Sequence, residues 1–237
     1  MAAPDQRAEV FERIREALQR PAPHRHAAHS SGAHPAPDDG LPASDEFRDW
    51  LPSVGITLDE QIELFARNAD ALKAEFFQAT TADDVVRQLA ELARENNWKR
   101  VATHAHPLAA GVAEKLSLSL PPLFTAPGYP VAELEQCDAA ITGCDALVAQ
   151  TGSVMVSAPG AGGRALSVLP PHHIVLARRG QMVPDLTAAF RRARELYAPD
   201  WPSFLSFITG PSRTGDIERI LVLGAHGPKR LTIFLLP

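Results

Sequence analysis

The sequence has few cysteines, and their number and spacing exclude the common cysteine-based scaffolds. Among 237 residues only Cys137 and Cys144 are cysteines, which is too few for the disulfide framework of a small secreted domain. They form no CxxC pair and no Cys/His cluster with zinc or iron–sulfur spacing. We therefore expect two reduced thiols, no metal site and no cofactor held by this chain itself.

Long apolar runs and an excess of positive charge are also missing. No uninterrupted apolar segment reaches the roughly 20 residues of a membrane-spanning helix. The formal net charge is -5, and an acidic surface repels the phosphates of nucleic acids. The first residues mix acids and bases, unlike the apolar core of a signal peptide. These absences predict a cytoplasmic protein with no membrane span and no nucleic-acid partner.

What the sequence does contain falls into three parts. Residues 1–20 have the apolar stripe of an amphipathic helix. Residues 21–43 are rich in Pro, Ala, Ser and His without an apolar period, which predicts a flexible linker. The histidines of this linker are irregularly spaced, so incidental metal binding is favoured over a specific site. Residues 44–237 are expected to form one domain.

Short apolar segments alternate with segments of helical period throughout that domain. This alternation predicts βαβ units, and hence an α/β fold with a mostly parallel sheet and helices on both faces. In such sheets ligands gather at the carboxyl ends of the strands. Helices are expected over 59–77, after Thr81, after Pro107 and over 184–197, the last with Leu186, Phe190 and Leu196 facing inward. Strands are expected over 99–103, 123–125, 139–142, 154–157, 173–177, 204–209 and 231–236.

The first candidate ligand site is the triplet Thr151-Gly152-Ser153, which Gln150 precedes. Two hydroxyls and several free backbone N–H groups surround a residue without a Cβ atom. Such a turn can approach a carboxylate or phosphate closely. A tight turn between two strands is the alternative, and it is favoured when the triplet is considered alone.

The second candidate is the glycine-rich loop 157–164, which follows a predicted strand and ends at Arg164. It matches neither G-x-x-x-x-G-K-[ST] nor G-x-G-x-x-G, so it is not a known nucleotide loop. The glycines favour a flexible connection. The guanidinium of Arg164 can pair bidentately with a carboxylate or phosphate.

The third candidate is the segment 207–218, in which Gly210 and a proline turn the chain after a predicted strand. Ser212, Thr214 and Asp216 then crowd an expected helix start, where unpaired N–H groups favour an anion. Simple capping of that helix explains one of these residues without a ligand, and both roles can hold together.

The fourth candidate is the loop 224–229, in which His226 stands beside Gly227. An imidazole between glycines is accessible to a ligand and can transfer protons near neutral pH, so His226 is the candidate catalytic residue. A lone histidine in a loop is more commonly just exposed to solvent.

Together these segments resemble the LUD-domain family, and within it the lactate utilization protein C subunits. The resemblance covers about 44–237 and rests on an ordered set of segments, AQTGS (149–153), LSVLP (166–170), ITGPSRTGDIE (208–218) and GAHGP (224–228). It implies a fold similar to the NagB/RpiA/CoA-transferase-like group. It also implies a role in oxidising L-lactate to pyruvate within a multi-subunit system, with iron–sulfur clusters expected on partner subunits.

One position departs from that family, which usually has an acid where Gln150 stands. A carboxylate can act as a base or covalent nucleophile, whereas an amide can do neither. Three interpretations stay open, namely an accessory subunit of a lactate-oxidation complex, a stand-alone enzyme and a metabolite sensor. The ligand in the last two is a small anion such as a CoA ester, a folate or a nucleotide-like metabolite. In an enzyme, the anion would contact Thr151, Ser153, Ser212 and Thr214, with Arg164 as its clamp and His226 as proton shuttle.

Overall fold

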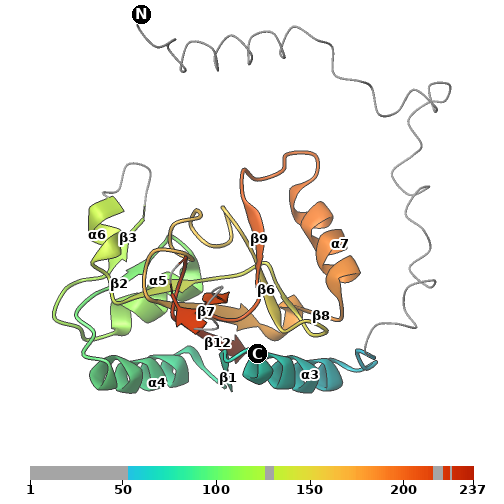
Figure 1. Ribbon diagram of the computed structural model, residues 1–237, viewed down its shortest axis with the longest axis horizontal. Helices are drawn as coiled ribbons and strands as arrows, with labels where there is room; N and C mark the ends of the chain where they lie inside the picture. The colour runs from blue at the N-terminus through green and yellow to red at the C-terminus, as the bar shows by residue number, and fades with distance from the viewer. Residues whose placement is uncertain (1–52, 126–130, 216–220, 225) are drawn as a thin grey trace, which may run out of the picture. The chain divides into compact units, whose positions relative to one another are not determined.

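The centre of the fold is a six-stranded sheet in which every neighbouring pair is parallel, with the order β1-β12-β7-β4-β2-β3. The structure is a computed structural model that describes residues 53–125, 131–215, 221–224 and 226–237 (Figure 1). The predicted helix 1–20 and linker 21–43 lie outside these residues. The strands are β1 (Glu75–Gln78), β2 (Val101–Thr103), β3 (Leu123–Phe124), β4 (Ala139–Thr142), β7 (His172–Arg178) and β12 (Arg230–Leu236).

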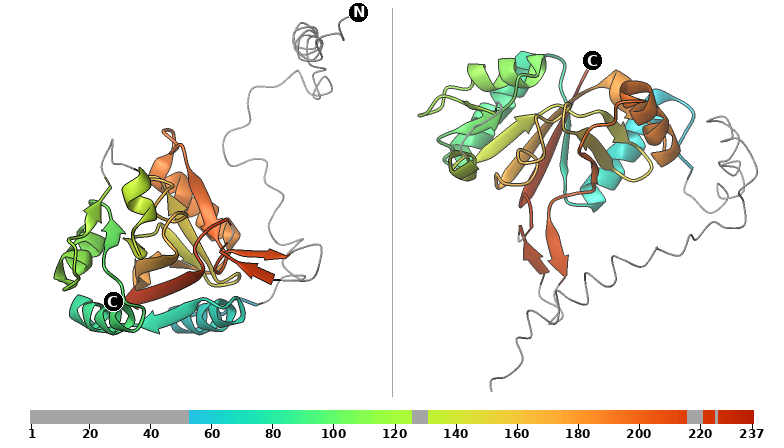
Figure 2. Two further views of the ribbon diagram at one scale, coloured as in Figure 1. Left: turned by 60° about the vertical axis from the view of Figure 1, so that its left-hand side comes forward. Right: turned by 90° about the horizontal axis from the view of Figure 1, so that it is seen from above.

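Helices cover both faces of this sheet, because the central strands β7 and β12 alternate apolar side chains between two cores. Val175 and Ile233 face a core that includes α3. Ile174 and Phe234 face a core that includes α4 and α5, and Figure 2 shows α3 and α4 on opposite sides of the sheet. The predicted α/β fold with a mostly parallel sheet is confirmed. The helices are α3 (Leu58–Ala71), α4 (Ala82–Glu95), α5 (Pro107–Lys115), α6 (Val131–Glu135) and α7 (Leu186–Tyr197).

A second sheet, with the order β8-β5-β6-β9, packs on the α3 side of the first. Leu147 and Val154 join the core that contains α3, while Ala189 and Ala193 of α7 cover the opposite face of the second sheet. Strands β5 and β8 are parallel, and β6 is antiparallel to both β5 and β9. The carboxyl ends of β5, β8 and β9 therefore lie at the same end of the second sheet. The strands are β5 (Ala146–Val148), β6 (Ser153–Ser157), β8 (Met182–Val183) and β9 (Leu205–Ile208), and a 3-10 turn, η1 (Arg179–Gln181), precedes β8.

The helix predicted over 59–77 is too long, because α3 ends at Ala71 and β1 follows. Lys73 adopts a left-handed conformation (φ 67°), and the N–H of Ala74 returns to the carbonyl of Ala69 at 2.9 Å. These are the features of a Schellman ending. The apolar period continues through Phe76 only because the following strand places that residue against the same core.

The face of α7 that packs inward also differs from the prediction. Ala189 and Ala193 are buried, whereas Leu186, Phe190 and Leu196 are 38%, 55% and 49% exposed. Alanine side chains let the helix lie close to the second sheet. The apolar period alone could not show which of two neighbouring stripes packs inward.

The helix start expected around Thr214 is also wrong. β10 (Arg213–Gly215) and β11 (Leu221–Leu223) instead form an antiparallel pair, a sheet of its own (Figure 2). Asp216 lies outside the described residues. Among the residues that the structure does describe, no helix has the length and apolar character needed to cross a membrane.

Replacing Gly152 by alanine should destabilise the fold by about 2 kcal/mol or more, because positive φ strains an L-residue. Its φ is 65°, and an added Cβ would come within 2.9 Å of Asn68. Gly111 of α5 is the matched control, since nothing lies within 4 Å of its added Cβ. Gly111→Ala should stabilise by up to about 1 kcal/mol through helix propensity. Urea unfolding of both variants measures this, and equal stabilities would contradict the packing described here.

Candidate functional site

The predicted turn 150–153 joins β5 to β6 and is fixed against the C-terminal half of α3. The side-chain amide of Asn68 donates to the carbonyl oxygens of Ala149 at 2.8 Å and Gln150 at 3.0 Å. Gly152 then lies directly on the backbone of that helix. The glycine is therefore required by the packing of the turn on α3, whether or not the turn also binds a ligand.

A second glycine turn approaches the end of the same helix. Gly210 has a φ of 78°, and an added Cβ would lie 2.8 Å from the carbonyl oxygen of Leu72. This approach brings Thr209, at the carboxyl end of β9, next to Ser153, at the start of β6. Their hydroxyl oxygens are 2.8 Å apart. Two segments separated by more than fifty residues are joined here by a hydrogen bond.

The fourth predicted segment, the loop with His226, is bound to the third, the segment with Ser212, by backbone hydrogen bonds. The N–H of Ser212 donates to the carbonyl oxygen of Pro228 at 2.8 Å, and the N–H of Gly224 donates to the carbonyl oxygen of Ser212 at 2.9 Å. Gly227 lies against the Ser212 side chain, and His226 is exposed. We call the three joined segments, 150–153, 209–213 and 224 with 226–228, the motif site.

Two groups in the motif site have chemistry that the described residues do not use. The Oγ1 atom of Thr151 is buried without a hydrogen-bond partner in the described structure, which costs about 1–3 kcal/mol unless a ligand or water satisfies it. Arg213 is exposed, with its guanidinium folded back toward Gly210. No carboxylate of the described residues forms an ion pair with it. Arg213 was absent from the predicted site, although it lies inside the third segment.

The remaining predicted residues do not join the motif site. Arg164 donates to the carbonyl oxygen of Ser203 at 3.4 Å and lies 5.9 Å from the ring centre of Phe204. Both partners precede β9, at the end of the strand opposite Thr209. The backbone of Thr214 pairs in β10. Ligand binding by any of the predicted residues stays a prediction.

A second polar group, which sequence reasoning missed, lies at the carboxyl ends of the parallel strands β2 and β4. The glycine-rich loop packs onto it, since added Cβ atoms at Gly160 and Gly162 would overlap Asp145 and His104 respectively. The glycines of this loop therefore allow close packing. His104 and His106 follow β2 directly, so the pattern strand–His–Ala–His–Pro was the available signal.

The hydroxyl of Tyr197 links three parts of this group. It donates to Oδ1 of Asp145 at 2.7 Å and lies 2.7 Å from Oγ of Ser157, which accepts the N–H of Gly160 at 3.1 Å. Burial, with a smaller effect of the Asp145 acceptor, raises the pKa of Tyr197 to about 12. The other oxygen of Asp145 is buried without a partner in the described residues.

The two histidines of this group have lowered pKa values, which favours their neutral forms. Burial, aided by the nearby His106, lowers the pKa of His104 to about 4, and burial and the charge of Arg178 lower the pKa of His106. Nδ1 of His106 accepts the N–H of Ala109 at 3.3 Å and caps α5. Nε2 of His104 is buried without a partner in the part of the chain described.

The two thiols are poorly suited to bind metals or to act as nucleophiles. Cys137 and Cys144 are both free and buried, and burial raises the pKa of each thiol. A thiol with a raised pKa carries little thiolate, the form that binds metals and attacks electrophiles. Within the described residues no group of three or more His, Cys, Asp or Glu side chains could hold a metal ion.

Residues 131–236 match the family model of the LUD domain. This segment is similar to LUD domains. It contains the motif site, Asp145, Ser157 and Tyr197, whereas His104 and His106 precede it. The resemblance expected from the four segments is confirmed.

The relatives are proteins named lactate utilization protein C. The chain is 36% identical over 99 residues to the one from Shouchella clausii and 33% identical over 128 residues to the one from Deinococcus radiodurans. These matches cover 41% and 53% of this chain and 43% and 59% of the relatives, so the chain spans about half their length. The relative from Oceanobacillus iheyensis is 27% identical, over 75% of this chain and 80% of its own.

A solved structure supports the fold. The crystal structure of a DUF162 family protein from Deinococcus radiodurans superposes with a TM-score of 0.57 at 24% sequence identity. The match covers 77% of this chain and 100% of the other. At this identity the likeness concerns the arrangement of helices and strands.

Acidification should destabilise the protein through His104. The pKa of His104 in the folded protein is about 4, below the ordinary value of 6.5. Between these two values the unfolded chain binds more protons than the folded one, so the free energy of unfolding decreases as the pH is lowered. His104→Gln removes this titration and should flatten the loss of unfolding free energy between pH 7 and 5, by about 1–2 kcal/mol at most. His226→Gln is the matched control, because His226 is exposed. Urea unfolding at each pH measures the slopes, and parallel slopes for His104→Gln and the unchanged protein would refute the assignment.

Proposed function

We propose that this chain is a subunit of a lactate-utilization system that binds a small carboxylate metabolite at the motif site. The printed names of its relatives support a role in lactate utilization. The observation that carries the binding role is the meeting of two distant segments at the end of α3, where Ser153 and Thr209 lie 2.8 Å apart. The third segment joins them through the backbone of Ser212.

The chemistry of the motif site suits a small carboxylate such as lactate or pyruvate. Hydroxyls at the carboxyl ends of β5 and β9 donate to carboxylate oxygens, and the buried hydroxyl of Thr151 lacks a partner in the described structure. The guanidinium of Arg213 supplies a charge-assisted donor pair for the same group. A 2-hydroxy or 2-oxo acid adds one further oxygen, which a neighbouring hydroxyl can bind.

Electron transfer is then the task of partner subunits that carry iron–sulfur clusters. Such clusters are ordinarily held by four thiolates, whereas this chain has two cysteines, both buried with raised pKa values. A subunit that binds the metabolite but holds no cluster must act beside proteins that accept the electrons.

Position 150 argues against covalent catalysis by this chain. The backbone of Gln150 is fixed on both sides, since its N–H donates to the carbonyl oxygen of Pro184 at 3.0 Å and its carbonyl oxygen accepts from Asn68. The turn thus keeps the position of the family's acid while replacing its carboxylate by an amide. A stand-alone enzyme that uses a carboxylate nucleophile is disfavoured by that replacement.

The isolated chain should bind lactate or pyruvate without converting either, and should show no turnover of CoA esters or formyl donors. Ligand-induced thermal shift measures binding, and Ser153→Ala and Thr209→Val should each lose most of the shift. Thr187→Val, at an exposed position of α7, is the matched control and should keep it. Turnover by the isolated chain would favour a stand-alone enzyme, and equal shifts in all variants would place the ligand elsewhere.

Cells that lack this chain should fail to grow on L-lactate but grow normally on pyruvate, because the loss precedes pyruvate formation. Tagged chain purified from lactate-grown cells should carry iron and acid-labile sulfide through its partners, whereas the chain purified alone from a foreign host should contain neither. Normal growth of the deletion strain on lactate would refute the role.

A further inference from the structure

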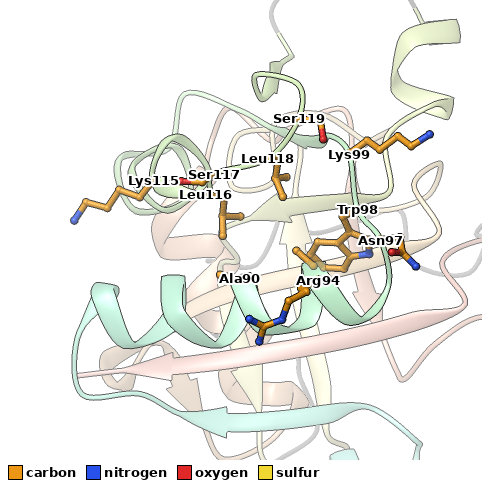
Figure 3. Close-up of a pocket in the computed structure, with 11 residues that line it drawn as sticks. Ala90, Arg94, Asn97, Trp98, Lys99, Lys115, Leu116, Ser117, Leu118 and Ser119 are labelled. Carbon is orange, nitrogen blue, oxygen red and sulfur yellow. The ribbon is translucent and has the colours of Figure 1, made fainter.

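A cavity of about 470 Å³ lies between the C-terminal ends of α4 and α5, on the face of the parallel sheet opposite α3 (Figure 3). Its volume is within the range of small-molecule sites. It shares no residue with the motif site. Its walls are formed by Ala90, Ala93, Arg94, Asn97, Trp98, Lys99, Lys115, Leu116, Ser117, Leu118 and Ser119.

The end of α4 builds one wall of this cavity. Asn97 adopts a left-handed conformation (φ 53°), and the N–H of Trp98 returns to the carbonyl oxygen of Ala93 at 2.8 Å. This Schellman ending turns the chain back beneath the helix. Trp98 is therefore only 8% exposed, and its ring and that of His172 form a T-shaped pair at a centre-to-centre distance of 5.3 Å.

The end of α5 builds the other wall. Leu116 is 6% exposed and belongs to the same core as Trp98. The chain after α5 then runs beside residue 99, where the N–H of Leu120 donates to the carbonyl oxygen of Lys99 at 3.0 Å. The deep part of the cavity is accordingly apolar, and the serines 117 and 119 are exposed.

The mouth of the cavity is positively charged. Arg94, Lys99 and Lys115 line it without any acidic residue, although the whole chain has a net charge of -5. Figure 3 shows the charged ends of these three side chains extending away from the apolar interior. Lys115 pairs with Asp83 at 2.7 Å, but both side chains are largely exposed, and such pairs contribute little.

The carboxylate of Asp138, which contacts the backbone of Lys99, is occupied by backbone N–H groups. One carboxylate oxygen of Asp138 accepts the N–H groups of Lys99 at 2.6 Å and Arg100 at 3.0 Å. Asp138 does not line the cavity. Among the described residues no carboxylate forms an ion pair with Arg94 or Lys99, so these two charges can pair with an anion from solution.

We propose that this cavity binds a medium-chain carboxylate, with its acyl chain against Trp98 and Leu116 and its head group on the side of the mouth that Arg94 and Lys99 line. Long cationic side chains at the rim of an apolar hollow suit a ligand whose charge stays near water while its chain is buried. Each CH₂ group that enters gains about 0.8 kcal/mol, and the cations select the ionised head group. The site is separate from the one proposed for lactate or pyruvate.

The test uses octanoate with 1-octanol as its uncharged counterpart, and the emission of Trp98 as readout. The chain has three tryptophans, so Trp50→Phe/Trp201→Phe leaves Trp98 as the sole reporter. Octanoate should change its emission saturably, and octanol should bind more weakly. Arg94→Ala/Lys99→Ala should weaken octanoate binding about tenfold.

Arg87→Ala/Arg191→Ala is the matched control, because it removes the same charge at exposed positions outside the cavity. It should leave the octanoate affinity unchanged. The absence of a saturable change, equal affinity for octanol, or equal weakening by the control pair would each overturn the proposal. Urea unfolding verifies that both double variants are folded.

Discussion

The relation between the two sheets depends on how closely two turns approach the C-terminal end of α3. Gly152 lies on the backbone of Asn68, and Gly210 lies on the carbonyl oxygen of Leu72. A side chain at either glycine would push β5, β6 or β9 away from the helix. The same contacts set Ser153 beside Thr209, so the packing of the second sheet and the geometry of the motif site have one cause.

This shared cause limits what the motif residues alone can reveal about ligand binding. The glycines of the first and third segments are needed for packing, so their presence does not by itself imply a ligand. The informative residues are those that the packing leaves unsatisfied. The Thr151 hydroxyl has no partner in the described structure, and Arg213 pairs with no carboxylate there. A carboxylate would supply what both groups lack among the described residues, which is why we propose that the ligand binds at this end of the second sheet.

The sequence was most informative where local chemistry decides the structure. The strand predicted over 139–142 has the bounds of β4, Thr81 caps α4 through a capping box, and Pro107 opens α5. It failed where tertiary contacts decide, as at β1, which continues the apolar period of α3, and at α7, whose alanine stripe packs inward. The predicted segments of the motif site were recognisable as motifs. Their meeting at α3 was not, because it depends on contacts between turns far apart in the chain.

The rule that ligands gather at the carboxyl ends of strands applies to both sheets. The polar side chains at these ends differ in burial and charge between the two sheets. At the parallel sheet, the glycine-rich loop covers His104 and Asp145, and Tyr197 ties this loop to α7 through Ser157 and Asp145. Burial keeps His104 neutral, so a bound anion there would meet no positive charge from it. At the second sheet, Arg213 and Thr209 are exposed, and they stand beside the buried Ser153 and the buried hydroxyl of Thr151. Electrostatics therefore favours the second sheet for a carboxylate, and leaves the covered group at the parallel sheet as part of the packing that holds the loop.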